Sequence, residues 1–370
     1  MKLRQLHIKG FKSIDGTVGQ TIQFGDVTVL LGANGSGKSN LISFFKMLNF
    51  MTTGALSQYV AKQGASRLLF YGPKKTGSIS FKLTFEDDKA EDTYEVLLSR
   101  GLPDKLIVGG EVITFHRKNA PQPQTYHLNT SPDESGLKND DQQTSKILYT
   151  LLSGVRTYQF HDTSETAKIK DRCYVDDAKY LRHDAGNLAA FLNMLKGHHL
   201  YSKYYNRIVR HIQRVMPQFG DFDFEPIPGA GDYVRLNWTD VSNSDYLFDP
   251  HQISDGSLRF MALATLLLQP PDLLPKFIVL DEPELGLHPA AIAELGGMVK
   301  IAAQNTQILL ATQSTRLVDE FEPENILIAE RDKETHSTIF KKLNADQLQI
   351  WLERYSLSEL WEKNVLGGQP

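Results

Sequence analysis

The chain is poor in cysteine, in uninterrupted apolar sequence and in excess positive charge. Its 370 residues include one cysteine, Cys173, which excludes an internal disulfide and a cysteine-rich metal site. Such usage is typical of the reducing cytoplasm, where we expect the protein to work. No stretch approaches the roughly 18 apolar residues of a membrane-spanning helix, so we expect no membrane partner. The formal net charge of −4 provides no global argument for nucleic-acid binding.

The rest of the composition, 41% hydrophobic and 23% charged residues, is that of an ordinary globular protein with one or two cores. The opening residues 1–7 alternate charged and apolar side chains, which predicts a first strand and not a signal peptide. Function therefore has to be inferred from local motifs.

The most informative motif is G-A-N-G-S-G-K-S at residues 32–39, which follows a short apolar strand at 27–31. Glycines let the backbone curl so that its N–H groups point at a polyphosphate, while Lys38 reaches the β- and γ-phosphates and the Ser39 hydroxyl can bind Mg²⁺. A helix expected over 40–48 adds its N-terminal dipole. This strand–loop–helix context favours a nucleoside triphosphate site over a glycine turn before an ordinary helix. The predicted contacts are Gly32, Asn34, Gly35, Ser36, Gly37, Lys38, Ser39 and Asn40.

A second motif ends the apolar run 277–280 with acidic residues, Asp281 and Glu282. Ligands bind at the carboxyl edge of a parallel sheet, where such a strand ends. Asp281 is therefore placed to hold Mg²⁺, and Glu282 to orient or deprotonate the attacking water. Acids at a strand end are common, but both motifs must share one sheet, and the combination favours a functional site.

Hydrophobic periodicity divides the chain into three expected parts. Residues 1–165 form an N-terminal lobe rich in alternating strands, residues 166–220 a compact helical insertion without sustained heptads, and residues 221–370 a C-terminal lobe of alternating helices and apolar strands. The expected strands are 2–8, 21–31, 78–85, 93–99, 111–117, 277–280, 307–311 and 325–330; helical spacing covers 176–216, 253–268 and 290–303; residues 121–143 read as an exposed loop. A hairpin and a terminal helix follow the last strand.

Two further motifs complete an ordered set. Residues 253–259 read I-S-D-G-S-L-R, and residues 311–314, A-T-Q-S, follow the acidic strand and its continuation E-L-G-L-H-P at 284–289. With the phosphate loop and the opening I-K-G-F-K-S at 8–13, this order resembles ABC-type ATPases of the SMC, RecF and OLD group. The resemblance implies an α/β fold: an ABC-type P-loop ATPase head with a mixed β-sheet core, an antiparallel β-subdomain and a short helical insertion.

The resemblance also implies a homodimer. Ser254 and Gly256 match the signature motif, which in this family docks on the γ-phosphate held by the other subunit, so that a head-to-tail dimer has two composite sites. Taken alone, Ser254 is equally a helix cap. His288 lies where the family has a dimer-contacting loop, so we expect it at the interface and not as a metal ligand.

Two glutamines carry further expectations. Gln313 stands where transporter-type relatives have histidine; it can hydrogen-bond the γ-phosphate but cannot take a proton, which leaves Glu282 as the evident base and predicts slow hydrolysis. Gln159, after a strand-like stretch, is the candidate for the family's Mg²⁺-contacting glutamine. His161 and Asp162 are either an unusual functional pair or caps of the next helix.

The leading functional hypothesis is an ATP- and Mg²⁺-dependent switch that clamps two subunits and controls a separate effector. Residues 158–163, 254–256 and 351–368 are similar to compact bacterial AAA/ABC ATPases that are paired with nuclease or Toprim-like effectors in anti-phage systems. The alternatives are a RecF-like DNA-repair ATPase that binds DNA directly and a nucleotide-gated scaffold without turnover. Long SMC arms are disfavoured, because only roughly 200 residues separate the phosphate loop from the signature. The opening motif and Gln313 disfavour a transporter ATPase.

Overall fold

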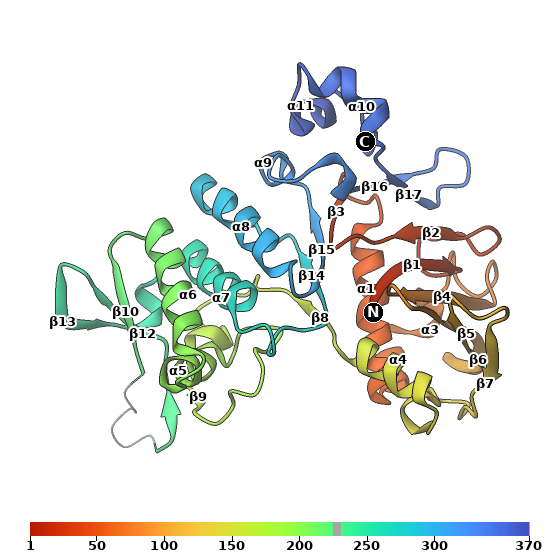
Figure 1. Cartoon of the computed structure of the whole chain (residues 1–370), viewed down its shortest axis with the longest axis horizontal. Coiled ribbons are helices and arrows are strands. Elements are labelled where there is room, and N and C mark those ends of the chain that lie inside the picture. The colour runs from red at the N-terminus through yellow and green to blue at the C-terminus, as the bar shows by residue number, and fades with distance from the viewer. Residues whose placement is uncertain (225–230, 370) are drawn as a thin grey trace.

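The computed structural model describes residues 1–224 and 231–369, and a six-stranded mixed sheet lies at its centre (Figure 1). The strand order is β17-β16-β3-β15-β14-β8; β17 is antiparallel to β16 and the other neighbours are parallel. The strands are β3 (Val27–Leu31), β8 (Val155–Tyr158), β14 (Phe277–Asp281), β15 (Gln307–Thr312), β16 (Ile326–Arg331) and β17 (Thr338–Lys342).

Alternate residues of the central strands face two separate hydrophobic cores. In β3, Val29 belongs to one core and Leu30 to the other, and Leu310 and Leu309 of β15 divide in the same way. Because both faces are covered, these strands are continuous apolar runs and not alternating ones. The sheet thus separates two lobes, each with its own core.

The first lobe packs α1 and an antiparallel sheet of order β2-β1-β4-β5-β6-β7 against one face of the central sheet (Figure 1). Aromatic rings join the layers: Phe45 of α1 stacks on Phe277 of β14 with ring centroids 5.1 Å apart. The bounds are β1 (Lys2–Lys9), β2 (Gln20–Gln23), β4 (Ser78–Glu86), β5 (Ala90–Gly101), β6 (Lys105–Arg117), β7 (Gln124–His127), α1 (Lys38–Thr53), α2 (Leu56–Gln63), α3 (Ala65–Leu68), η1 (Leu137–Asn139) and α4 (Gln143–Ser153).

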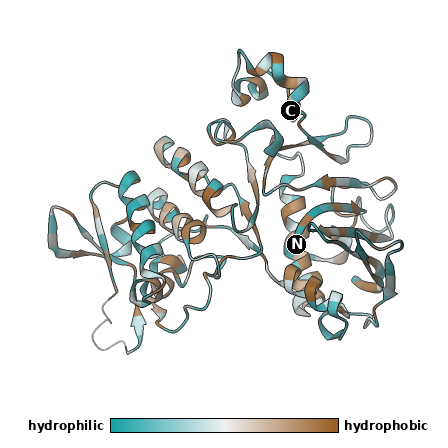
Figure 2. Ribbon diagram, in the orientation of Figure 1, coloured by the Kyte–Doolittle hydropathy of each residue, from teal (hydrophilic) through white to brown (hydrophobic). Residues whose placement is uncertain are grey.

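The second lobe covers the opposite face with helices. In Figure 2 the visible face of α6 is largely hydrophilic, whereas α8 and the central strands carry more hydrophobic residues. The bounds are α5 (Leu188–Gly197), α6 (Ser202–Val215), α7 (Asp255–Leu268), α8 (Pro289–Ala302), η2 (Lys168–Lys170), η3 (Pro250–Gln252), β9 (Cys173–Tyr174) paired with β11 (Tyr233–Val234), and a three-stranded sheet of β10 (Phe219–Asp223), β12 (Asn237–Asp240) and β13 (Asn243–Phe248).

A third group of short elements flanks the β16–β17 hairpin along the chain, and its last two helices, α10 and α11, lie at the top of Figure 1. It comprises α9 (Thr315–Val318), η4 (Pro323–Asn325), α10 (Ala345–Leu352) and α11 (Leu357–Glu362). Within the described residues, no helix combines the length and apolar character needed to cross a bilayer.

The predicted α/β head with a mixed sheet and an antiparallel β-subdomain is confirmed, as are the first strand and the meander of β4, β5 and β6. Four local predictions are wrong. The expected strand 21–31 is two strands in different sheets, because Gly25 and Asp26 turn the chain between them; the expected loop 121–143 contains β7 and η1; residues 176–187 are turns that precede α5; and the expected terminal helix is the pair α10 and α11. The lobe boundaries at 165 and 220 stay predictions.

Candidate nucleotide-binding site

Strand register brings four motifs to one edge of the central sheet. Asp281 of β14 is level with Ala311 of β15, and Thr312 of β15 with Leu31 of β3. The residues that follow these strands, which include the phosphate loop, Glu282 and Gln313, therefore leave the sheet side by side. On the far side of β14, Tyr158 of β8 pairs with Leu280, so Gln159 emerges beside Asp281. Ligands of parallel sheets bind at such carboxyl edges.

The phosphate loop connects β3 to α1 in the required conformation. Gly35 and Gly37 have φ of 79° and 110°, which an L side chain rarely adopts. Asn34, Gly35 and Ser39 are exposed, whereas Ser36 and Gly37 are buried. Because the backbone N–H groups at the start of α1 lack partners within the helix, this turn provides an anion site with an exposed entrance.

Lys38 closes over the loop that carries it. Its Nζ donates to the carbonyl oxygens of Gly32 at 2.5 Å and Ala33 at 3.1 Å, and the side chain is buried. Burial lowers the pKa of the Lys38 ammonium, an effect that the carboxylates of Glu282 and Asp281 oppose. The Lys38 ammonium is thus held at the loop, beside the backbone N–H groups at the start of α1, where it could contribute to binding a polyphosphate.

Asp281 lies beside polar residues from the segment that follows β8, and beside Lys46 of α1. The amide of Gln159 lies 3.4 Å from its Oδ2, and His161 Nε2 lies 2.9 Å from its backbone oxygen. Lys46 Nζ is 3.5 Å from Gln159 Oε1. Burial raises the pKa of Asp281, while the Lys46 ammonium opposes that shift. A bound divalent cation would favour the ionised carboxylate.

The pair at 161–162 does not cap a helix, so that alternative is wrong. Asp162 Oδ1 accepts from the backbone and hydroxyl of Ser164 in a local turn, and η2 begins only at Lys168. Instead His161 contacts Asp281, which links this segment to the acidic strand.

Glu282 and Gln313 contact one another across β14 and β15. The Gln313 amide donates to Glu282 Oε1, and Glu282 N donates to Ala311 O at 2.8 Å. Glu282 has φ of 43°, a strained conformation that is frequent at functional sites and is held here by the strand pairing. The carboxylate is thus oriented at the sheet edge, where an attacking water would need a base.

Glu284 is half-buried and contacts Thr312 at the end of β15. The Thr312 hydroxyl donates to its Oε1 at 2.5 Å, and burial raises the pKa of the Glu284 carboxyl despite that hydrogen bond. This hydrogen bond anchors Glu284 to the end of β15.

The signature residues lie in the other lobe. Ser254 caps α7 through Ser257 N at 3.2 Å, and its side chain is exposed. A Cβ on Gly256 would lie 2.4 Å from Gly286 O, so glycine is required where α7 packs on the segment after Glu284. α7 packs in one core and α1 in the other (Figure 1). A protomer therefore presents its phosphate loop and its signature on different lobes.

Arg259, one turn into α7, links the signature to both sides of the acidic strand. Its guanidinium donates to the backbone oxygens of His161 and Leu285, each at 2.9 Å, and to Thr163 Oγ1 at 3.2 Å. His288 Nδ1 accepts from Ala290 N as the exposed cap of α8. The sequence alone assigns no role to Arg259; its position one turn after Ser254 is the signal that could have indicated one.

The available donors fit Mg²⁺ that arrives with a nucleotide. Ser39 offers a hydroxyl, Asp281 a carboxylate and Gln159 an amide oxygen, and Mg²⁺ commonly combines one or two carboxylates with substrate phosphates and water. Among the described residues, no group of three or more His, Cys, Asp and Glu is arranged to hold a metal.

The motifs are those of a P-loop ATPase, and the fold resembles that of SMC head domains. The chain belongs to the AAA_21 family, described as "AAA domain, putative AbiEii toxin, Type IV TA system", whose model matches residues 27–319. It is 15% identical to an SMC head crystallised with the C-winged helix domain of ScpA, with TM-score 0.58 over 95% of this chain and 100% of that one. It is 16% identical to an SMC head domain from Thermotoga maritima, with TM-score 0.51 over 93% of this chain and 100% of that one.

Two curated relatives match in part. The "Putative ABC transporter ATP-binding protein MG303" of Mycoplasma genitalium is 27% identical over 123 residues, which is 33% of this chain and 32% of that protein. The chloroplastic "ABC transporter I family member 11" of Arabidopsis thaliana is 34% identical over 103 residues, 26% of this chain and 36% of that protein. The chain thus spans about a third of each relative, and these matches support only the ATPase class.

Proposed function

We propose that this protein is an ATP-driven molecular switch that works as a head-to-tail homodimer. ATP and Mg²⁺ bind the phosphate loop of one protomer, the Ser254 signature of the second protomer closes on the γ-phosphate, and slow hydrolysis through Glu282 releases the pair. The observation that carries this proposal is the separation of the signature and the phosphate loop on two lobes, with Ser254 exposed. One chain alone would leave each half-site incomplete.

In this switch the residues of the chain have distinct tasks. Lys38 and the loop N–H groups bind the triphosphate; Ser39, Asp281 and Gln159 would hold Mg²⁺, which neutralises phosphate charge. Glu282 takes a proton from the attacking water, and Gln313 orients its carboxylate. Since the Gln313 amide cannot accept that proton, turnover depends on a single base and is slow.

A mixing experiment tests the two-site geometry. Ser254→Arg and Lys38→Ala should each abolish hydrolysis as pure proteins. Together they form one site from a wild-type phosphate loop and a wild-type signature, so partial ATPase activity should return. The control mixes Lys38→Ala with the double variant, which leaves no intact site and should stay inactive. If Ser254→Arg alone hydrolyses ATP as a monomer, the proposal fails.

The biological role we propose is regulation of a separate effector in a bacterial defence system. The family description, with its AbiEii and toxin–antitoxin terms, supports this role. Pull-down from the native host, with Glu282→Gln in ATP and Lys38→Ala as control, should recover an effector such as a nuclease with the first variant only. Recovery of no nucleotide-dependent partner would contradict this part of the proposal.

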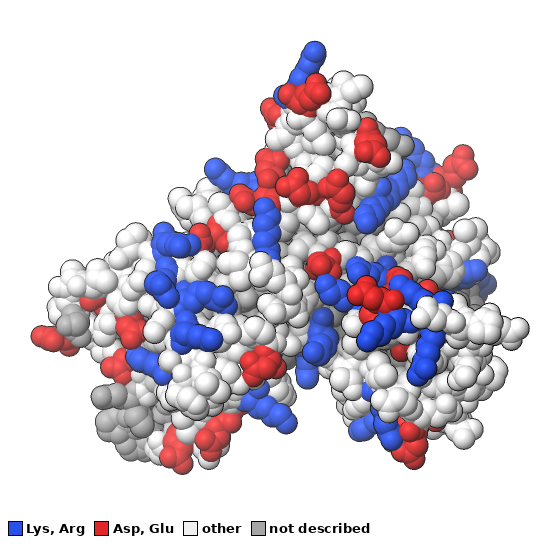
Figure 3. Space-filling view, in the orientation of Figure 1, with Lys and Arg blue, Asp and Glu red and all other residues white. Residues whose placement is uncertain are grey.

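A second candidate, direct DNA binding of RecF type, is favoured by the basic face of α6. Lys203, Arg210 and Arg214 are exposed at helical spacing, and Figure 3 shows basic side chains gathered over this lobe. Arg214 also pairs with Glu294 at 2.9 Å. If DNA is the ligand, Arg210→Glu should weaken binding of a labelled duplex, whereas Lys333→Glu on the β16–β17 turn should not. If the wild-type protein does not bind the labelled duplex at low salt, direct DNA binding is excluded.

A further inference from the structure

The phosphate loop is hydrogen-bonded to two segments that lie some three hundred residues further along the chain. The Thr338 hydroxyl at the start of β17 donates to Ser36 O at 2.9 Å. On the other side of the loop, Ala33 N donates to Gly368 O at 2.8 Å. Neither contact involves a group that sequence motifs assign to the nucleotide, and both act on the loop backbone.

Thr338 stands at the centre of a buried polar chain. Asn40 Nδ2 donates to Ser13 Oγ at 2.6 Å, and the Ser13 and Thr338 hydroxyl oxygens are 2.7 Å apart. When the Ser13 hydroxyl donates to Thr338 and the Thr338 hydroxyl donates to Ser36 O, each hydroxyl donates one hydrogen bond and accepts one. Thr338 is 0% exposed, so water cannot replace these bonds. These hydrogen bonds connect the phosphate loop to Ser13 of the opening motif and to Thr338 of β17.

Close packing adds to the hydrogen bonds at this point. A Cβ on Gly37 would lie 2.1 Å from Thr338 Oγ1, so the loop and β17 approach as near as glycine permits. Thr338 N also donates to Ser13 O at 2.7 Å, which ties the start of β17 to the segment between β1 and β2. A small shift of Thr338 must therefore move the loop backbone.

Gly368 holds the loop from the opposite side. Gly367 and Gly368 have φ of 81° and 78°, and a Cβ on Gly368 would lie 2.8 Å from Ile328 Cγ2. Gly368 N donates to Glu330 Oε2 at 3.2 Å, and Glu330 also pairs with Lys341 of β17. Only a residue without a side chain can bring its carbonyl to Ala33 here.

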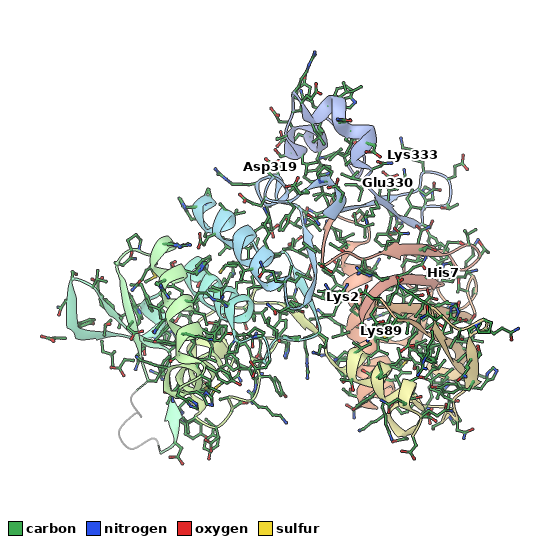
Figure 4. All side chains as sticks on the ribbon, viewed as in Figure 1. Lys2, His7, Lys89, Asp319, Glu330 and Lys333 are labelled. Atoms are coloured by element: carbon green, nitrogen blue, oxygen red, sulfur yellow. The ribbon has the colours of Figure 1, made fainter. Side chains whose placement is uncertain are left out.

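The C-terminal residues also contact α9, the short helix that follows Gln313. At the start of α11, Ser358 donates through N at 2.9 Å and through Oγ at 2.6 Å to the carboxylate of Asp319. Asp319 ends α9, which begins just after Gln313. Figure 4 labels Asp319 and Glu330, both of which lie beneath the α10–α11 pair.

We propose that Thr338 and Gly368 are positioning residues of the nucleotide site. Their bonds to Ser36 O and Ala33 N hold the loop backbone in its phosphate-binding form before ATP arrives, so nucleotide affinity depends on β17 and on residues 366–369. This inference rests on the proposed ATP binding at the phosphate loop. It assigns no contact with the nucleotide to either residue.

Thr338→Val tests the hydroxyl with little change of shape. We expect ATP affinity, measured by calorimetry, to fall about tenfold, the equivalent of one lost net hydrogen bond. Thr338→Ser keeps the hydroxyl and should restore affinity to within about threefold. The matched control is Thr306→Val, because Thr306 is also buried and donates to Pro275 O at 2.6 Å, but precedes β15 at the opposite edge of the sheet. That control should lower the melting temperature without changing ATP affinity.

A glycine pair provides an independent test. Gly368→Ala should weaken ATP binding, whereas Gly54→Ala should not, since Gly54 has a similar φ of 77° but open space around its would-be Cβ. Equal ATP affinity in the wild type, Thr338→Val and Gly368→Ala would overturn the positioning role while leaving the ATPase assignment intact. A wild type that binds no ATP would overturn the ATPase assignment, and the positioning role with it.

Discussion

Removing the Arg259 guanidinium should uncouple the signature helix from the acidic strand. The side chain is half-buried and donates three hydrogen bonds, to two backbone oxygens and one hydroxyl. At about 0.5–1.5 kcal/mol for each net bond, Arg259→Ala should cost about 2–4 kcal/mol of unfolding free energy. For a chain of this length, that cost corresponds to a melting temperature lower by about 3–5 °C.

The catalytic effect should be larger than the effect on nucleotide binding. Arg259 donates to Leu285, three residues after Glu282, and to the 161–163 segment that follows β8, but to none of residues 32–39 in the hydrogen bonds of the described chain. ATP affinity of the isolated subunit should therefore change less than about twofold. In the proposed switch, turnover requires Glu282 and the signature to be aligned, so it should fall by about tenfold or more.

Two controls make the experiment specific. Arg259→Lys keeps the charge but cannot reach both backbone oxygens with one ammonium, so it should behave like the alanine variant. Arg210→Ala, which removes an exposed arginine from α6, should change stability by less than about 0.5 kcal/mol. Differential scanning fluorimetry and a phosphate-release assay measure the two effects. Normal turnover in Arg259→Ala at an unchanged melting temperature would refute the reasoning.

Three further predictions follow from the site. Lys38→Ala should abolish ATP binding in calorimetry, because no other residue of the loop 32–39 carries a cation that could replace its ammonium at the β- and γ-phosphates; wild-type affinity would contradict this. Glu282→Gln should bind ATP normally but release no phosphate, since an amide accepts no proton; equal turnover would point to another base. Glu284→Gln should raise the melting temperature at pH 8, and the gain should shrink as the pH falls toward 4.5. Burial raises the pKa of Glu284, so the ionised form destabilises the fold above that raised pKa, and the difference vanishes where the carboxyl is protonated in both folded and unfolded chains. A gain that grows in acid would show that this sign is wrong.

The parts of the fold that could be predicted are those governed by local pattern. Strict alternation identified β4, β5 and β6, and the glycine-rich loop after an apolar strand identified the start of α1. The break between β2 and β3 could not be predicted in the same way, because residues 21–31 are apolar enough to read as one strand and only tertiary pairing sends its halves to different sheets. The turns at 176–187 were missed because helical spacing appears there without a helix.

The candidate site divides along similar lines. Contacts within a motif follow from spacing, and the shared sheet edge follows from the rule that parallel strands end together. Contacts between motifs cannot be predicted from spacing or from this rule. Nothing in local sequence pairs Gly368 with Ala33, Thr338 with Ser36 or Arg259 with His161, because each pair is set by how distant segments pack. The positive φ of Gly367 and Gly368 becomes meaningful only once Glu330 is known to lie against Gly367 and Ile328 against Gly368.

The most direct test of the proposed switch is the mass of Glu282→Gln in solution, measured by light scattering with and without Mg²⁺ and ATP. The switch predicts a particle of one chain, 41.7 kDa, without nucleotide and of twice that mass with ATP. Adding Ser254→Arg to the same protein should return it to one chain although ATP still binds. The head-to-tail, ATP-clamped dimer would be contradicted if the mass is the same with and without ATP, or if the Ser254→Arg variant still dimerises with ATP.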